Sequence, residues 1–458
     1  MKQVVVQGLG FVGLAMSIAI ASSRDQKGSP LYNVIGLDLP SEEGLKKVDS
    51  INSGELPLKS SDKALEAEFY ECIKHNNLSA STDPKVISNA DYVIVDINLD
   101  VTHTEEKEYI NFEGFSNAIS TVGEYMSEDT LVIIETTVPP GTTEKIAYPI
   151  LVEKLKKRFP NIREVFLAHS YERVMPGPNY YNSIKNFWRV FAGCNRESSI
   201  RCKDFLKTII NTDEYKMMEL KKPSASETAK IMENSFRALN IAFIDEWSNF
   251  SKLIGVNLFE VIDAIRVRPT HKNIMEPGLG VGGYCLTKDP LMGKISLDQI
   301  YGEKLNFPLS ELSVKINKKM PNNTLELIKT NLKNYQNGKI LVMGITYRED
   351  VGDLRFSPSE DLIRKLLKDN LRIDCFDPMV DYTNCKGAKL IADLPIANNY
   401  DAIVFTVKHS KFKDIDLNSW LANFKGIIID SNHVLSNNKI DELSNIGIRI
   451  KAIGRGDL

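Results

Sequence analysis

Short β-rich runs alternate with helical patterns along the first half of the chain. Each apolar run is followed by a longer stretch in which apolar residues recur every three or four positions. The predicted strands, all within residues 1–216, are QVVVQ, NVIGLD, DYVIVDI, TLVIIET, EVFLAHS and RVFAG. This alternation predicts an α/β domain with a parallel, doubly wound sheet.

The β-rich runs disappear between about Glu219 and Pro321, where residues 225–253 form an amphipathic stretch without proline or glycine. We expect one long helix there. Strand patterns resume with KILVMGI, RIDCFD, YDAIVFTV and GIIIDS, after the turn-forming NLKNYQNG. The fold is therefore expected to be α/β, with two Rossmann-like doubly wound domains at residues 1–216 and 331–458, joined by a helical middle segment at residues 217–330.

The charge balance excludes some classes of partner. The 458 residues carry a net charge of −3, without the basic surplus that nucleic-acid binding favours. Glycines interrupt the apolar N-terminal run, which indicates a strand and a turn rather than a signal peptide. No segment approaches the roughly 20 apolar residues that span a bilayer. We expect a cytoplasmic protein without nucleic-acid or membrane partners.

Cysteine and histidine give no metal signal. The six cysteines lack metal-ligand spacing and a disulfide framework, so reduced thiols are expected. None of the six histidines forms an HExxH-type pair. A zinc hydrolase is improbable, and no metal is predicted.

The string GLGFVG lies directly between a predicted strand and a predicted helix. In such a turn the first glycine permits the tight bend, the second lets backbone amides approach a pyrophosphate, and the third lets helix and strand pack closely. The predicted cofactor-binding residues of this turn are Gly8, Gly10, Phe11, Val12 and Gly13. Asp38 ends the next strand, where a carboxylate accepts hydrogen bonds from a ribose diol and repels a 2′-phosphate. The predicted cofactor is NAD.

A second glycine-rich stretch, PGLGVGGYCLTKDP, contains a cysteine. Gly280, Gly282 and Gly283 leave its backbone free to wrap around a ligand. Cys285 follows where a helix could begin, and a helix N-terminus and the nearby Lys288 would both lower the pKa of its thiol. A thiolate can trap an aldehyde as a thiohemiacetal, which a nicotinamide cofactor can oxidise to a thioester. Asp289 could then activate water for hydrolysis.

With these motifs the chain resembles the UDP-glucose/GDP-mannose dehydrogenase family over nearly its whole length. The landmarks, in family order, are GLGFVG, TTVPPGTT, YERVMPG, AKIMENSFRALNIAFIDE, PGLGVGGYCLTKD, GITYREDVGDLRFSPS and IGIRIKAIG. The resemblance implies a four-electron oxidation of a nucleotide-sugar C6 alcohol to the carboxylate, using two NAD+.

The resemblance also implies roles for individual residues. Cys285 would be the nucleophile and Asp289 the water-activating carboxylate, while Lys230 and Asn234, one helical turn apart, would stabilise the oxyanion. Thr137 would lie at the nicotinamide end, and Glu172 would border the sugar and assist proton movement. The remaining expected contacts are Arg355 with the cofactor, and Arg173, Tyr347, Arg348 and either Arg266 or Arg268 with the substrate.

The family implies that one arginine of that pair crosses from a neighbouring subunit and that the long helix builds a dimer. A homodimer or higher homo-oligomer is therefore expected. Which arginine crosses stays open.

Substrate choice also stays open. ERVMPG, and the DP after Lys288, resemble the subgroup that oxidises UDP-N-acetylhexosamines such as UDP-N-acetylglucosamine or UDP-N-acetylmannosamine. TKD resembles the UDP-glucose subgroup instead, and Asn432 stands where UDP-glucose enzymes often carry a substrate-binding arginine. We favour the N-acetylated substrate, with a role in polysaccharide biosynthesis, and keep UDP-glucose 6-dehydrogenase as the alternative. Alternatives from other classes are a simpler hydroxyacid dehydrogenase and a non-catalytic nucleotide-sugar binding protein.

Overall fold

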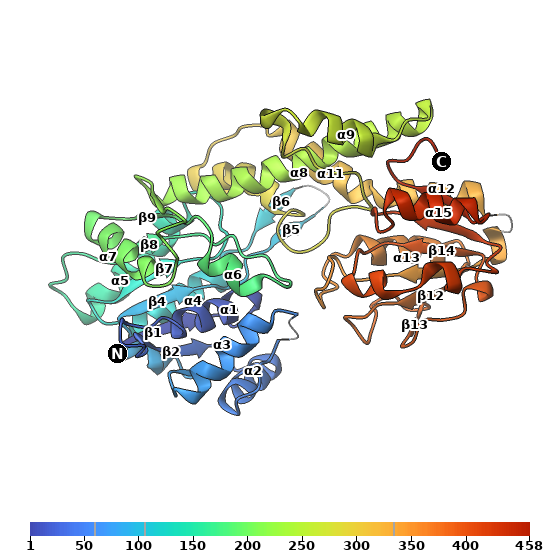
Figure 1. Cartoon of the computed structure of the whole chain (residues 1–458). Coiled ribbons are helices and arrows are strands. Elements are labelled where there is room, and N and C mark those ends of the chain that lie inside the picture. The colour runs from blue at the N-terminus through green and yellow to red at the C-terminus, as the bar shows by residue number, and fades with distance from the viewer. Residues whose placement is uncertain (59–60, 105–106, 333–334) are drawn as a thin grey trace. The chain divides into compact units, whose positions relative to one another are not determined.

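The computed structural model describes residues 1–58, 61–104, 107–332 and 335–458 (Figure 1). The chain divides into two compact units. The first comprises residues 1–233 and 291–307, and the second comprises residues 234–290 and 308–458.

The first unit contains an eight-stranded sheet of order β10-β9-β8-β7-β4-β1-β2-β3. Its strands are β1 (Lys2–Gln7), β2 (Tyr32–Leu37), β3 (Leu78–Ser81), β4 (Tyr92–Val95), β7 (Leu131–Ile134), β8 (Phe166–His169), β9 (Val190–Gly193) and β10 (Met218–Glu219). From β3 to β8 the strands are parallel in the Rossmann order. The prediction of a parallel sheet is wrong for β9, which runs antiparallel to β8. The only α-helix between these two strands is the six-residue α6 (Tyr180–Lys185), whereas parallel neighbours usually need a longer crossover.

Helices of the first unit cover this sheet. They are α1 (Phe11–Ala21), α2 (Glu42–Asn52), α3 (Lys63–Lys74), α4 (Glu113–Tyr125), α5 (Tyr148–Arg158), α6 and α7 (Arg196–Lys207), and a small hairpin joins β5 (Val101–His103) to β6 (Glu108–Ile110). Helix α1 is apolar around most of its circumference because it packs between β2 and the helices α3 and α6. This packing fixes the start of α1 against the end of β1.

The second unit contains a six-stranded sheet of order β13-β12-β11-β14-β15-β16, parallel throughout. The strands are β11 (Lys339–Met343), β12 (Arg372–Phe376), β13 (Lys389–Ile391), β14 (Ala402–Phe405), β15 (Ile427–Asp430) and β16 (Arg449–Ala452). Chain order along the sheet is again that of a Rossmann fold, as predicted. The covering helices include α13 (Pro358–Lys368), α14 (Leu417–Trp420) and α15 (Asn437–Asn445).

Helix α8 (Pro223–Ile254) has 32 residues and confirms the long helix predicted from the amphipathic stretch. The boundary between the two units falls within it. The other helices of the middle segment are α9 (Leu258–Arg266), α10 (Met292–Ser296), α11 (Pro308–Lys319) and α12 (Pro321–Asn331). In the described part of the chain, no helix combines the length and the apolar character needed to cross a membrane.

Near the start of α8, Glu227 binds the PPG turn that follows β7. Its carboxylate accepts hydrogen bonds from the backbone N–H groups of Gly141, at 2.5 Å, and Thr143, at 2.8 Å. The side chain is buried, and this burial raises the pKa of Glu227 to about 7. The helix is thereby attached to the segment that contains Thr137.

We predict that Glu227 makes stability depend on pH. Between pH 4.5 and 7 the folded protein holds a proton that the unfolded chain has lost, so the free energy of unfolding falls as pH rises through this window. For one proton the slope is at most about 1.4 kcal/mol per pH unit. Urea unfolding at pH 5 and pH 8 should show a smaller fall for Glu227→Gln than for the wild type. The exposed Glu66→Gln is the control, and an unchanged fall in Glu227→Gln would contradict the prediction.

Candidate active site

The glycine turn between β1 and α1 has little room for side chains. Gly8 has a φ of +100°, and a Cβ atom there would overlap the backbone carbonyl of Asp96. A Cβ atom at Gly13 would overlap the carbonyl of Gly8, whereas the space beside Gly10 is open for 4 Å. Phe11 and Val12 begin α1 and are half-buried. The turn therefore fits a bound dinucleotide, whose pyrophosphate would lie over Gly10 and the first turn of α1.

Asp38 lies beside this turn, as expected. It directly follows β2, and the preceding Leu37 accepts a hydrogen bond of 2.8 Å from the N–H of Gly8. One carboxylate oxygen accepts from the N–H of Leu39, and the other lies 3.4 Å from the ammonium of Lys47. The side chain is partly exposed, which suits a ribose diol.

Two acidic residues beside the glycine turn were missed by sequence reasoning. Asp96 and Glu135 directly follow the paired strands β4 and β7. Arg189 forms a buried ion pair with Glu135 at 2.7 Å, and Asp96 Oδ2 faces Gly13. Burial raises the pKa of both carboxyl groups. The sequence could have indicated these two residues, because each is an acidic residue at the end of an apolar run, in YVIVD and LVIIE.

Lys230 and Glu172 meet in the first unit. The Lys230 ammonium donates to the backbone carbonyl of Glu172 at 2.7 Å and lies 3.5 Å from its carboxylate, and both residues are buried. Arg173 binds Glu233 through its guanidinium and also donates to the hydroxyl of Tyr171 at 3.0 Å. Thr137, after β7, is half-buried. Lys230 and Glu172, two residues predicted for the active site, are therefore in direct contact.

Cys285 is exposed, in the second unit. Its backbone carbonyl accepts hydrogen bonds from the N–H groups of Lys288, at 3.1 Å, and Asp289, at 2.9 Å. The residues after Cys285 thus form a turn, and a short 3-10 helix begins only at Asp289. The helix expected to begin at the cysteine therefore begins four residues later, at Asp289.

Both carboxylate oxygens of Asp289 are occupied. Lys288 contacts Oδ1 at 3.0 Å, and the amide of Asn234 donates to Oδ2 at 2.7 Å. Asp289 and Lys288 are buried. The ammonium expected to act on the thiol therefore neutralises Asp289, and the amide expected to bind an oxyanion holds the same carboxylate.

The glycines of the cysteine loop lie against the loop after β11. A Cβ atom at Gly283 would come within 2.7 Å of the Tyr347 ring, and one at Gly282 would crowd the same side chain. Gly280 has a φ of +153°, and a Cβ atom there would come within 3.1 Å of Pro358. Tyr347 thus fits only because the loop lacks side chains at these positions.

The two arginines predicted after β11 remain at the surface. Arg348 lies 3.8 Å from the carboxylate of Glu349. Arg355 forms a 2.7 Å ion pair with Asp353, and its backbone carbonyl accepts from the N–H of Gly283. Both guanidinium groups keep part of their surface exposed.

Arg266 and Arg268 have different surroundings in the structure. Arg266 donates to the carboxylate of Glu276 at 2.7 Å and to the carbonyl of Ile274 at 2.9 Å. Arg268 is exposed. Arg268 is therefore the more exposed of the two side chains.

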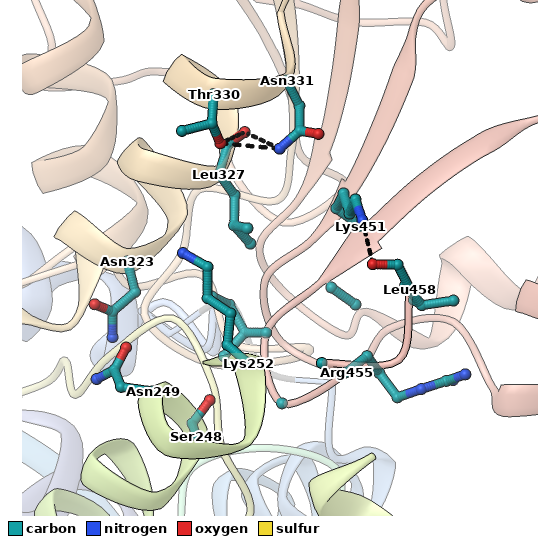
Figure 2. A pocket seen from close by; sticks show the side chains of 14 residues that line it. Ser248, Asn249, Lys252, Asn323, Leu327, Thr330, Asn331, Lys451, Arg455 and Leu458 are labelled. Atoms are coloured by element: carbon teal, nitrogen blue, oxygen red, sulfur yellow. Dashed lines mark hydrogen bonds between the residues drawn. The ribbon is translucent and has the colours of Figure 1, made fainter. Parts of the chain in front are cut away.

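A cavity of about 350 Å³ lies elsewhere in the second unit, between the C-terminal half of α8, α12 and the last residues of the chain (Figure 2). Lys451 in its wall binds the carbonyl of Leu458, and Lys252 lies 3.8 Å from Glu326. Its lining includes none of the residues predicted for the active site.

Known family models match three consecutive parts of the chain. The NAD-binding domain of the UDP-glucose/GDP-mannose dehydrogenase family matches residues 2–211, its central domain residues 224–319, and its UDP-binding domain residues 341–437.

Individual relatives match over almost the full length. UDP-N-acetyl-D-mannosamine dehydrogenase from Methanocaldococcus jannaschii is 28% identical, over 99% of this chain and 97% of that protein. Among solved structures, UDP-D-ManNAc dehydrogenase from Pyrococcus horikoshii is 26% identical with a TM-score of 0.82, covering 100% of both chains. NDP-N-acetyl-D-galactosaminuronic acid dehydrogenase from Methanosarcina mazei is 27% identical with a TM-score of 0.78, covering 100% of this chain and 96% of that one.

The glycine turn, the carboxylate beside it and the matched NAD-binding domain define an NAD-dependent oxidoreductase that acts on a CH–OH donor. The matches to all three domains identify the family. The chain belongs to the UDP-glucose/GDP-mannose dehydrogenase family.

We predict that Asn234→Ala destabilises the second unit by roughly 1.5–3 kcal/mol, because a buried carboxylate loses a charge-assisted hydrogen bond. Urea unfolding measures the change. Asn249→Ala on the same helix is the matched control, since it loses only a bond to a carbonyl one turn earlier. Equal losses in the two variants would contradict the assigned role of Asn234.

Proposed function

We propose that this protein oxidises the C6 alcohol of UDP-N-acetyl-D-mannosamine to the carboxylate, with two NAD+ as hydride acceptors. The observation that carries the proposal is an exposed cysteine in a glycine-rich turn whose neighbouring carboxylate is held by a buried lysine and an asparagine. The names of the similar proteins support the N-acetylmannosamine substrate.

The proposed reaction passes through a covalent intermediate on Cys285. When bound, NAD+ accepts a hydride in each of the two oxidations. The C6 alcohol loses a hydride and a proton to give an aldehyde, and the Cys285 thiolate adds to its carbonyl carbon. After proton uptake this adduct is a thiohemiacetal, which loses a second hydride and its hydroxyl proton to give a thioester. Water then attacks the thioester, which releases the carboxylate and the thiol.

The geometry suggests how the other residues act. Asp289 is fixed at both oxygens and would accept a proton from the attacking water. Glu172 would assist proton movement at the alcohol, and the Lys230 ammonium, 3.5 Å from its carboxylate, would stabilise the developing oxyanion. In this scheme Asn234 positions Asp289 rather than binding the oxyanion.

The remaining assignments follow the domain matches. We propose that residues 1–216 hold NAD, that residues 331–458 hold the UDP moiety, and that Thr137, Arg173, Arg268, Tyr347, Arg348 and Arg355 contact the ligands. The cytoplasmic location expected from the sequence stays a prediction. The alternative substrate is UDP-glucose. Comparing the rate of NADH formation with UDP-glucose and with UDP-N-acetyl-D-mannosamine distinguishes the two.

We also propose that α8 forms a homodimer interface. Phe236, Phe243 and Phe250 recur every seven residues and are exposed, and Trp247 contacts the last two rings. Apolar side chains spaced in this way typically face another helix. A second copy of the chain would cover them.

For the dimer, we expect Trp247→Glu to reduce the mass in solution by half, because a charge would be buried at the centre of the interface. Light scattering after size-exclusion chromatography measures the mass. Ile396→Glu, at another exposed apolar position, is the control. A wild-type protein that is monomeric at micromolar concentration would contradict the proposal.

For the reaction, we expect Cys285→Ser to lose acid formation from UDP-N-acetyl-D-mannosamine by at least about 10³-fold, since an alkoxide is harder to generate and leaves poorly. Product analysis by mass spectrometry should include UDP-glucose and UDP-N-acetylglucosamine as competing substrates. Cys194→Ser, a half-buried cysteine elsewhere, is the matched control. Steady acid formation by Cys285→Ser would exclude the covalent mechanism, and preferred turnover of UDP-glucose would exclude the assigned sugar.

A further inference from the structure

Arg237 lies on α8 three residues after Asn234 and therefore on the same face of the helix. This face borders the cysteine turn. Asn234 binds the carboxylate of Asp289 at 2.7 Å, and the N–H of Asp289 donates to the carbonyl of Cys285 at 2.9 Å. A long side chain one turn further along the helix is thus within reach of the thiol.

The electrostatic neighbours of Arg237 agree with this placement. Its charge interacts with Cys285, Tyr347, Arg348 and Glu349. Tyr347 also interacts with Cys285, and its ring lies against Gly283 of the cysteine loop. The guanidinium therefore belongs to the group of residues around the thiol, although the motif AKIMENSFRALNIAFIDE was used only for Lys230 and Asn234.

Sequence reasoning assigned two stabilising features to the thiol, the charge of Lys288 and a helix N-terminus. In the structure Lys288 pairs with Asp289, and the helix begins after the cysteine turn. Lys288 is buried, and its ammonium lies 3.0 Å from Asp289 and 4.5 Å from the centre of the Tyr284 ring. Its charge is thereby neutralised. The 3-10 helix begins four residues after Cys285, and its three residues provide only a small dipole.

Positive charge remains on the other side of the turn. Burial and the nearby guanidinium of Arg348 lower the pKa of Arg237. Arg237 and Arg348 are thus two cations in this region, and Glu349 lies 3.8 Å from Arg348. A thiolate in this region would be stabilised by charge attraction.

We propose that Arg237 stabilises the thiolate of Cys285 and so prepares the nucleophile for reaction. The inference rests on the proposed role of Cys285 in catalysis. Arginine stays protonated at every physiological pH, so its effect on the thiol is present before substrate or cofactor binds. Because Cys285 is exposed and Arg237 keeps part of its side-chain surface in contact with solvent, salt should weaken the interaction.

The test is the rate at which iodoacetamide alkylates Cys285 as a function of pH, without sugar or NAD, measured by mass spectrometry of the Cys285 peptide. Arg237→Gln should shift the profile to higher pH and reduce the rate at pH 7 by about 3- to 10-fold. Arg237→Lys keeps the charge and should recover most of the rate. Raising the salt concentration to 1 M should narrow the difference between wild type and Arg237→Gln.

Lys252→Gln is the control, because it removes a positive charge from the same helix beside the cavity in Figure 2. Thermal unfolding establishes that each variant is folded. A profile for Arg237→Gln that superimposes on the wild type, or an equal shift in Lys252→Gln, would overturn the proposal. The assay needs no turnover, so failure of the proposed reaction and failure of this inference are measured separately.

Discussion

The buried carboxylate of Asp289 joins the cysteine turn to the long helix α8. Lys288 binds one oxygen and Asn234 the other, so the buried carboxylate has a neutralising charge and a hydrogen-bond donor. Removing one partner of such a group is costly, because the remaining charge stays buried. This constraint fixes the turn, and with it the position of Cys285 relative to Asn234 and Arg237.

At both glycine-rich loops, the absence of side chains lets other parts of the chain approach closely. At Gly8 and Gly13 a Cβ atom would overlap backbone carbonyls, so β1 and α1 can meet only through glycine. At Gly282 and Gly283 the limiting neighbour is the Tyr347 side chain. The first loop leaves space for a pyrophosphate, and the second lets the loop after β11 approach the cysteine.

Much of the fold could be predicted because its signals are local. Buried parallel strands have continuous apolar runs, and the glycine turn follows its strand immediately. Strands such as β3, with the sequence LSAS, and the two-residue β10 were missed because they are short and contain few apolar residues. The antiparallel direction of β9 depends on the path of the preceding segment, which residue patterns do not specify.

The site was harder to predict because its contacts join residues distant in sequence. Cys285 and Asp289 lie in one short motif, but the partner of Asp289 on α8 lies 55 residues earlier. Likewise, Lys288 is adjacent to Asp289 in the sequence, but only the structure shows that its ammonium forms an ion pair with the Asp289 carboxylate. Pairing of Arg266 with Glu276 could not be distinguished from phosphate binding by residue type.

The central claim is that one cysteine carries the sugar through two successive oxidations. The most direct measurement counts NADH formed per UDP-N-acetyl-D-mannosamine consumed, by absorbance and by chromatography of the sugar nucleotides. The account predicts two NADH for each sugar, with the uronate as the only released product. One NADH per sugar, with the aldehyde released, would contradict it.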